Sequence, residues 1–200
     1  MPHINLSDHP GILAALDMRP DIAEPLKQMT NAMLLGPSNG ILPEPAKSKL
    51  GALTLTSAER ELIGAYVSKL NTCQFCATSH SAIAARLYDG AEDFVDSVIC
   101  KGDHPDLSPK MRALLTIARK VQGDAKSVSS EDIKKAKQAN ASESDIYDTV
   151  IITGMFCMFN RIVDGLSLNI PEDKSYYSDC AKRVQEFGYR ATSHDQPSRQ

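Results

Sequence analysis

Residues 71–87, NTCQFCATSHSAIAARL, contain the most informative pattern in this chain. Cys73 and Cys76 are three positions apart and His80 follows four positions later, at the start of a segment with helical periodicity. At about 100° per residue, these three side chains share one face of a helix within two turns. The pattern is compatible with a redox-active cysteine pair and its proton relay, with part of a zinc site, or with a buried seam.

The two cysteines fall in the expected first turn of this helix. Backbone N–H groups lack partners there and the helix dipole is positive, so the position favours the reactive thiolate form. His80, one turn further along, is a candidate to exchange a proton with a sulfur, because an imidazole can accept or donate a proton at neutral pH. The other cysteines, Cys100, Cys157 and Cys180, follow no disulfide framework pattern.

The preceding segment, SAERELIGAYVSKL, is expected to form a helix that ends near Leu70. Thr56 and Glu59 have the spacing of a capping box at its start. Glu61 lies opposite the apolar face, on a stripe of small residues: Gly64, Ala65, Ser68 and Thr72. Because small residues let a second helix approach closely, we expect Glu61 to be a partly buried carboxylate that accepts a proton.

Helical periodicity extends over nearly the whole chain, and no convincing strand pattern occurs, so we expect an all-α, single-domain fold. Residues 41–53 contain two prolines and are expected to form an irregular connection, and residues 190–200 a polar tail. The expected organisation is N-terminal helices and connection (1–52), a core (53–168), and a C-terminal helix with the tail (169–200). The other expected helices span about 10–18, 20–35, 91–100, 109–122, 130–139, 143–168 and 172–188.

Composition excludes several classes of function. The chain has 200 residues, 42% of them hydrophobic, and a formal net charge of −3. It has no basic patch for nucleic acid or an anionic membrane surface. No signal peptide or apolar run long enough to span a bilayer is apparent, so we expect a cytoplasmic protein.

Polar residues interrupt the most apolar expected helix in the sequence FNRIVDG, residues 159–165. Burying an unpaired polar group costs free energy, so the polar side chains at these positions must be paired or face an interface: Asn160, Arg161 and Asp164. We expect a buried ion pair between Arg161 and Asp164.

A zinc site is one alternative for the cysteine cluster. Cys73, Cys76 and His80 supply three ligands, and Cys100 or His104 is a candidate for the fourth. The sequence contains no second C-x-x-C or H-x-x-x-H motif to complete such a site. Haem attachment is excluded because Ala77, and not histidine, follows the C-x-x-C motif.

Glu61, eleven intervening residues and then Cys73-x-x-Cys76-x-x-x-His80 together resemble the signature of the alkylhydroperoxidase D-like (AhpD-like), carboxymuconolactone decarboxylase-like superfamily. The segment ELIGAYVSKLNTCQFCATSHSAIA, with the later FNRIVDGL, is similar in particular to its peroxidase-related members. The resemblance implies an AhpD-like helical bundle, with the C-x-x-C motif at the start of a core helix, that assembles as trimers or hexamers. This chain departs from the best-known peroxidase at Phe75, where that protein has a histidine between the cysteines.

The resemblance also implies the roles of the residues. Cys76 is the peroxidatic cysteine that becomes a sulfenic acid, Cys73 resolves it by forming the Cys73–Cys76 disulfide, and Glu61 and His80 form the proton relay. We therefore predict a thiol-dependent alkyl hydroperoxidase or disulfide reductase in antioxidant defence, with no cofactor and no metal. Its partners would be a small hydroperoxide and an external dithiol, or a thioredoxin- or lipoyl-type reductant. The side chains of Phe75, Tyr66 and Phe94 are candidates to line an apolar entrance.

Two other functions are compatible with the same residues. In the first, Glu61 and His80 are the acid and base of a carboxymuconolactone decarboxylase-type enzyme, and the thiols are not needed. In the second, the chain is a zinc-stabilised or redox-sensing helical module without enzymatic activity.

Overall fold

The computed structural model describes residues 1–36 and 54–189, and within these ranges the chain is all-α, as predicted. The expected irregular connection at 41–53 and the expected tail at 190–200 lie outside the described residues. The α-helices are α1 (Ile12–Asp17), α2 (Pro20–Thr30), α3 (Ser57–Leu70), α4 (Gln74–Leu87), α5 (Glu92–Lys101), α6 (Pro109–Asp124), α7 (Ser130–Gln138), α8 (Glu143–Gly165) and α9 (Lys174–Phe187). A π-helical turn, η1 (Asn31–Leu35), extends α2, and a short 3₁₀ turn, η3 (Ala125–Ser127), follows α6.

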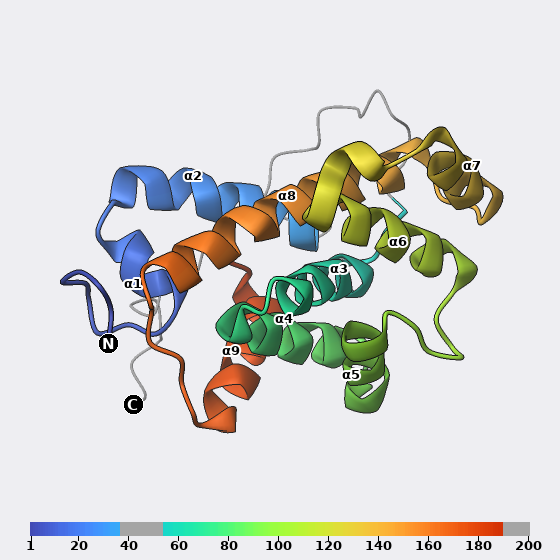
Figure 1. Ribbon diagram of the computed structural model, residues 1–200. Coiled ribbons are helices and arrows are strands. Elements are labelled where there is room, and N and C mark those ends of the chain that lie inside the picture. Colours follow the sequence, from blue (N-terminus) through green and yellow to red (C-terminus); the bar gives the residue numbers. More distant parts are fainter. Residues whose placement is uncertain (37–53, 190–200) are drawn as a thin grey trace.

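Helix α3 occupies the centre of the molecule, between α4 on one side and α8 on the other (Figure 1). Every residue from Arg60 to Ser68 is buried. A helix that is buried on all sides belongs to the core. Glu61 is consequently fully buried, and not partly buried as the sequence suggested.

The ends of the central helices follow from local side-chain and backbone chemistry. The predicted capping box is confirmed: Glu59 N–H donates to Thr56 Oγ1 at 3.1 Å, and Thr56 N–H donates to Glu59 Oε2 at 2.8 Å. Helix α8 ends at Gly165, three residues earlier than expected, because Ser167 adopts a positive φ of 52°. The backbone then closes the helix with a bond from the Leu168 N–H to the Val163 carbonyl, the pattern of a Schellman cap.

Helix α8 is long and apolar enough to cross a membrane by length and composition alone. Half of its apolar window is buried inside the protein, as is usual for a core helix of a folded domain. Its buried side includes Ile152, Phe156 and Phe159, which belong to the main core. Its other side exposes Tyr147, Val150 and Met158.

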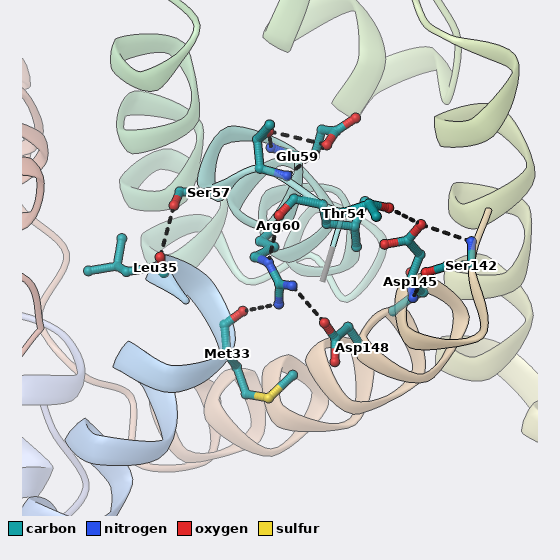
Figure 2. Close-up of polar contacts among 12 residues, drawn as sticks. Met33, Leu35, Thr54, Ser57, Glu59, Arg60, Ser142, Asp145 and Asp148 are labelled. Atoms are coloured by element: carbon teal, nitrogen blue, oxygen red, sulfur yellow. Dashed lines mark hydrogen bonds and ion pairs between the residues drawn. The ribbon is translucent and has the colours of Figure 1, made fainter. Parts of the chain in front are cut away.

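A buried ion pair joins α3 to α8 and to the end of η1 (Figure 2). The guanidinium of Arg60 donates to Asp148 Oδ2 at 2.6 Å, to the Met33 carbonyl at 2.9 Å and to the Leu55 carbonyl at 3.1 Å. Figure 2 also shows Ser57 Oγ donating to the Leu35 carbonyl, at 3.1 Å. These bonds fix η1 and the start of α3 against α8, and so define the end of the bundle opposite the cysteines.

Candidate active site

The junction between α3 and α4 positions the two cysteines. Asn71 ends α3, and Thr72 follows with a positive φ of 60°, which is rare for a β-branched residue. The N–H of Thr72 then bonds to the Lys69 carbonyl and the N–H of Cys73 to the Ser68 carbonyl, each at 3.0 Å. Cys73 therefore terminates one helix and serves as the N-cap of the next, so its position is fixed by both helices.

Both thiols are enclosed. Cys73 is 0% and Cys76 4% exposed, and both are free cysteines. They belong to a small apolar cluster, separate from the main core, that includes Ala14 of α1, Val163 of α8 and Tyr177 of α9. The N-terminal and C-terminal helices thus cover the sulfurs.

Phe75, between the cysteines, is a central part of that cover. Its ring approaches Gly11 so closely that a Cβ on Gly11 would lie 2.0 Å from the ring. The ring also lies 6.4 Å from the ring centroids of both Tyr176 and Tyr177 on α9. Tyr66 and Phe94 pack in the main core instead. The idea that these three aromatic residues line one entrance is therefore wrong.

Glu61 and His80 come together as predicted. Nδ1 of His80, on α4, lies 2.7 Å from Oε2 of the fully buried Glu61, on α3. Since a carboxylate only accepts hydrogen bonds, the proton of a neutral His80 resides on Nδ1, which leaves Nε2 as an acceptor. His80 lies one helical turn beyond Cys76 on the same face of α4.

The small-residue stripe on α3 is used as expected. A Cβ on Gly64 would lie 2.3 Å from the ring of Phe156, so only glycine leaves room for that ring of α8. The ring of Phe156 in turn packs against His80 in a T-shaped arrangement, with centroids 4.6 Å apart. Gly64 therefore helps to hold the imidazole against Glu61.

Tyr189 joins the Glu61–His80 pair, and no pattern in the sequence indicates this contact. Its hydroxyl donates to Glu61 Oε1 at 2.6 Å and lies 3.3 Å from His80 Nδ1. Its backbone N–H donates to Asn31 Oδ1 at 2.7 Å, which fixes the residue after α9. Burial and the charge of Glu61 raise the pKa of Tyr189 well above its ordinary value, so this phenol remains a donor.

The surroundings of Cys76 act against the thiolate-favouring effect that is expected at a helix start. The hydrogen bond with Cys73 raises the pKa of Cys76, and burial raises it further. A hydrogen bond from the side chain of Asn160 acts in the opposite direction. Cys73 and burial thus oppose the effect of the helix start on this sulfur.

The polar residues of FNRIVDG are arranged differently from the sequence expectation. Arg161 and Asp164 are both exposed, so the predicted buried pair between them is wrong. Arg161 instead donates to Asn71 Oδ1 at 3.2 Å. Asn160, which is fully buried, donates from Nδ2 to Ser68 Oγ at 3.1 Å. Helical geometry explains the difference. Asn160 lies on the face of α8 that packs in the core, whereas Arg161 and Asp164 lie on a face that is open to solvent.

The zinc alternative finds no ligand set in the part of the chain that the structure describes. No three His, Cys, Asp or Glu side chains are grouped there so as to hold a metal ion. His80 Nδ1 faces the Glu61 carboxylate, Cys100 is exposed on α5, and His104 packs against the ring of Phe94.

A hollow of about 840 Å³ between α4, α5 and α9 does not contain the reactive groups. Its lining includes Lys69, Ser81, Arg86 and Cys100, but neither Cys73, Cys76, His80 nor Glu61.

The helical bundle, with an enclosed C-x-x-C pair at the start of a core helix, has an AhpD-like fold. Among solved structures, the chain is similar to an uncharacterised peroxidase-related protein with an AhpD core from Ralstonia eutropha JMP134 (24% identity, TM-score 0.68, covering 86% of this chain and 81% of that one). It is also similar to an uncharacterised peroxidase-related protein from Silicibacter sp. TM1040 (23% identity, TM-score 0.67, covering 84% and 78%).

A third similar structure is a protein of unknown function from Agrobacterium tumefaciens, for which the role of an antioxidant defence protein AhpD has been suggested (18% identity, TM-score 0.63, covering 86% of this chain and 100% of that one). At these identities the similarity establishes the fold. No protein-family model and no curated protein matches the chain.

Proposed function

We propose that this chain is a thiol-dependent peroxidase that reduces small hydroperoxides through the Cys73–Cys76 pair. The observation that carries the proposal is the 2.7 Å contact between His80 Nδ1 and Glu61 Oε2, one turn from the cysteine pair. A buried acid–base pair beside two reduced cysteines supplies the proton transfers that peroxide reduction by a thiol requires. The descriptions of the structurally similar proteins as peroxidase-related agree with this proposal.

In the proposed first step, His80 Nε2 takes the proton of the Cys76 thiol. The Cys76 sulfur then attacks the terminal oxygen of the hydroperoxide, the O–O bond breaks, and Cys76 becomes a sulfenic acid. The alkoxide takes a proton from the imidazolium and leaves as an alcohol. Because the pKa of Cys76 is raised, this step depends on a base, and the carboxylate of Glu61 stabilises the imidazolium that forms.

In the second step, the Cys73 thiol condenses with the sulfenic acid. The S–S bond forms, the S–O bond breaks and water leaves, so two thiols and one hydroperoxide yield a disulfide, an alcohol and water. An external dithiol restores the pair by thiol–disulfide exchange and is itself oxidised to a disulfide. Run in the opposite direction, with the Cys73–Cys76 dithiol as the reductant, the same exchange would reduce an external disulfide.

Access to the sulfurs requires movement of their cover. Because Cys76 is 4% exposed, a hydroperoxide reaches it only when α1, α9 or the chain beside them moves aside. The cover is apolar around Phe75 and Tyr177, which favours small organic hydroperoxides as substrates.

Peroxide consumption in the presence of dithiothreitol tests the proposal. The wild-type chain and Cys157→Ser should consume tert-butyl hydroperoxide, and Cys76→Ser should not. Cys157 is a suitable control because it is a free cysteine outside the proposed pair. Full turnover by Cys76→Ser would refute the assignment.

A second candidate function is favoured by one observation. Glu61, His80 and Tyr189 form a hydrogen-bonded group that includes no sulfur. Such a group can serve as acid and base in a lactone decarboxylation or isomerisation. A variant with both Cys73→Ser and Cys76→Ser distinguishes the two, because it would keep this activity and lose peroxide reduction.

We also propose that the protein is a cytoplasmic homo-oligomer. The exposed apolar side chains of Tyr147, Val150 and Met158 along α8 support an interface between copies. Light scattering after gel filtration tests the assembly, and a monomer at micromolar concentration would contradict it.

A further inference from the structure

The turn that joins α3 to α4 contains a strained residue directly before Cys73. Thr72 has a φ of 60°, in the left-handed region that glycine usually occupies after a helix. Its hydroxyl donates to the Asn71 carbonyl at 2.6 Å. A β-branched residue is an outlier in this region, and such a conformation persists only where the surrounding structure fixes it. The contacts around the turn must therefore hold Thr72 in place.

The side-chain amide of Asn71, the residue before Thr72, is held by α6 and α8. Its Oδ1 accepts from Gln122 Nε2 at 2.9 Å and from Arg161 Nη1 at 3.2 Å. A guanidinium has only donors, so the second bond identifies Oδ1 as the amide oxygen. On its other side, Nδ2 donates to Asn160 Oδ1 at 2.8 Å. Asn71 is thus fixed to two other helices.

Asn160 closes the turn from the core. It is 0% exposed, and its Nδ2 donates to Ser68 Oγ at 3.1 Å. Ser68 is also 0% exposed, and its backbone carbonyl accepts from the Cys73 N–H at 3.0 Å. Asn160 therefore binds both Asn71, which precedes Thr72, and the residue to which the backbone of Cys73 is bonded. One side chain of α8 fixes both ends of the turn.

We propose that Asn160 and Asn71 are positioning residues for the cysteine pair. They hold Thr72 in its left-handed conformation, and Thr72 in turn fixes Cys73 beside Cys76. The two cysteines lie in one buried cluster, at the N-cap and in the first turn of α4. Two thiols that the fold holds together form a disulfide with a high effective concentration. The proposal rests on the disulfide of the proposed function, but not on the reduction of peroxide.

The test is the equilibrium between the reduced full-length protein and its Cys73–Cys76 disulfide in glutathione buffers at pH 7, read by mass spectrometry of alkylated peptides. In this reaction, two protein thiols and glutathione disulfide yield the protein disulfide and two glutathione thiols. The equilibrium constant measures how well the folded protein holds the two sulfurs together. A loss of stability alone lowers Tm and leaves this constant of the folded protein unchanged.

Asn160→Leu, which is similar in size but forms no side-chain hydrogen bonds, should lower the equilibrium constant about tenfold. Asn71→Leu should change it in the same direction. The matched control is Thr153→Val, which removes an equally buried hydrogen bond of α8, from the Thr153 hydroxyl to the Thr149 carbonyl. Thr153→Val should leave the constant unchanged.

Thr72→Gly distinguishes the positioning role from a general effect on packing. Glycine adopts the left-handed conformation without strain, so Thr72→Gly alone should keep a constant close to that of the wild type. The double variant Asn160→Leu with Thr72→Gly should recover most of what Asn160→Leu loses. The four proteins form a double-mutant cycle whose coupling measures the effect of Asn160 on the turn.

An Asn160→Leu protein that keeps its helical circular dichroism and the wild-type equilibrium constant would overturn the proposal. An equal loss with threonine and with glycine at position 72 would overturn it too, as would a wild-type protein that forms no such disulfide. If Asn160→Leu fails to fold, Asn71→Leu with and without Thr72→Gly provides the same comparison. A wild-type protein that shows the predicted cycle but reduces no hydroperoxide would refute the proposed function alone.

Discussion

The hydroxyl of Tyr189 donates to Glu61 Oε1 at 2.6 Å, although the two residues are 128 positions apart in the sequence. This bond ties the end of α9 to the centre of α3, directly beside His80. The two oxygens of the buried carboxylate are thus divided between a phenol and an imidazole. The C-terminal helix therefore does more than cover the thiols, because the residue that follows it also holds the carboxylate of the Glu61–His80 pair.

Tyr189→Phe removes one hydrogen bond from this carboxylate while keeping the ring. We expect the free energy of unfolding to fall by about 1–3 kcal/mol, because Glu61 Oε1 is left buried without a donor. We also expect slower peroxide reduction, because the carboxylate that orients His80 is less well fixed. Urea unfolding and steady-state turnover measure the two effects. The matched control is Tyr88→Phe, whose ring packs against Phe94 and not against Glu61 or His80, and equal effects of the two changes would contradict the assigned role.

Gly64 provides a test of the packing behind His80. Gly64→Ala should destabilise the protein by about 1–3 kcal/mol, because the new methyl group overlaps the ring of Phe156. Gly154→Ala, in α8, is the control: nothing lies within 4 Å of its Cβ position, so helix propensity alone should stabilise it by roughly 0.5–1 kcal/mol. Thermal unfolding of both variants checks the prediction, and changes of the same sign would refute it.

The ion pair of Arg60 and Asp148 tests the other end of the bundle. Arg60→Met should cost about 3–5 kcal/mol, because it leaves the Asp148 carboxylate buried without its partner. Asp21→Asn, which breaks an exposed ion pair with Arg19, should change little. Chemical denaturation measures both changes. A small effect of Arg60→Met would show that the contacts drawn in Figure 2 do not anchor η1 to α8.

The raised pKa of Cys76 predicts how stability depends on pH. Below the ordinary cysteine pKa of about 8.5, both the folded and unfolded chains hold this proton, and the contribution of Cys76 to stability is fully present. Above it, the unfolded chain loses the proton first, so stability falls by up to about 1.4 kcal/mol per pH unit. Unfolding under reducing conditions between pH 8 and 10 should show a shallower decline for Cys76→Ala. Parallel curves for the two proteins would contradict this account.

The helical elements and the Glu61–His80 pair could be predicted from the sequence because their signals are local. The capping box of Thr56 and Glu59 and the spacing of Cys76 and His80 depend on residues within one or two turns. The burial of Glu61 could be predicted in direction, from the small residues beside it, but not in degree.

The rest of the site depends on tertiary contacts. Tyr189 lies at the end of a polar helix, and no pattern in the sequence connects it with α3. Arg161 on α8 donates to Asn71 at the end of α3, and the residues next to Arg161 in the sequence do not indicate this contact. The pKa of Cys76 is raised by the contact with Cys73 and by burial, and the position at a helix start does not indicate the cover that α1 and α9 provide.

The most direct test of the central claim is mass spectrometry of the reduced protein after one equivalent of tert-butyl hydroperoxide. The account predicts the loss of two thiols, a Cys73–Cys76 disulfide and one equivalent of alcohol in the wild-type protein. It also predicts that Cys73→Ser stops at a sulfenic acid on Cys76 and that Cys76→Ser consumes no peroxide. A wild-type protein that consumes the peroxide with Cys73 and Cys76 both still reduced would contradict it.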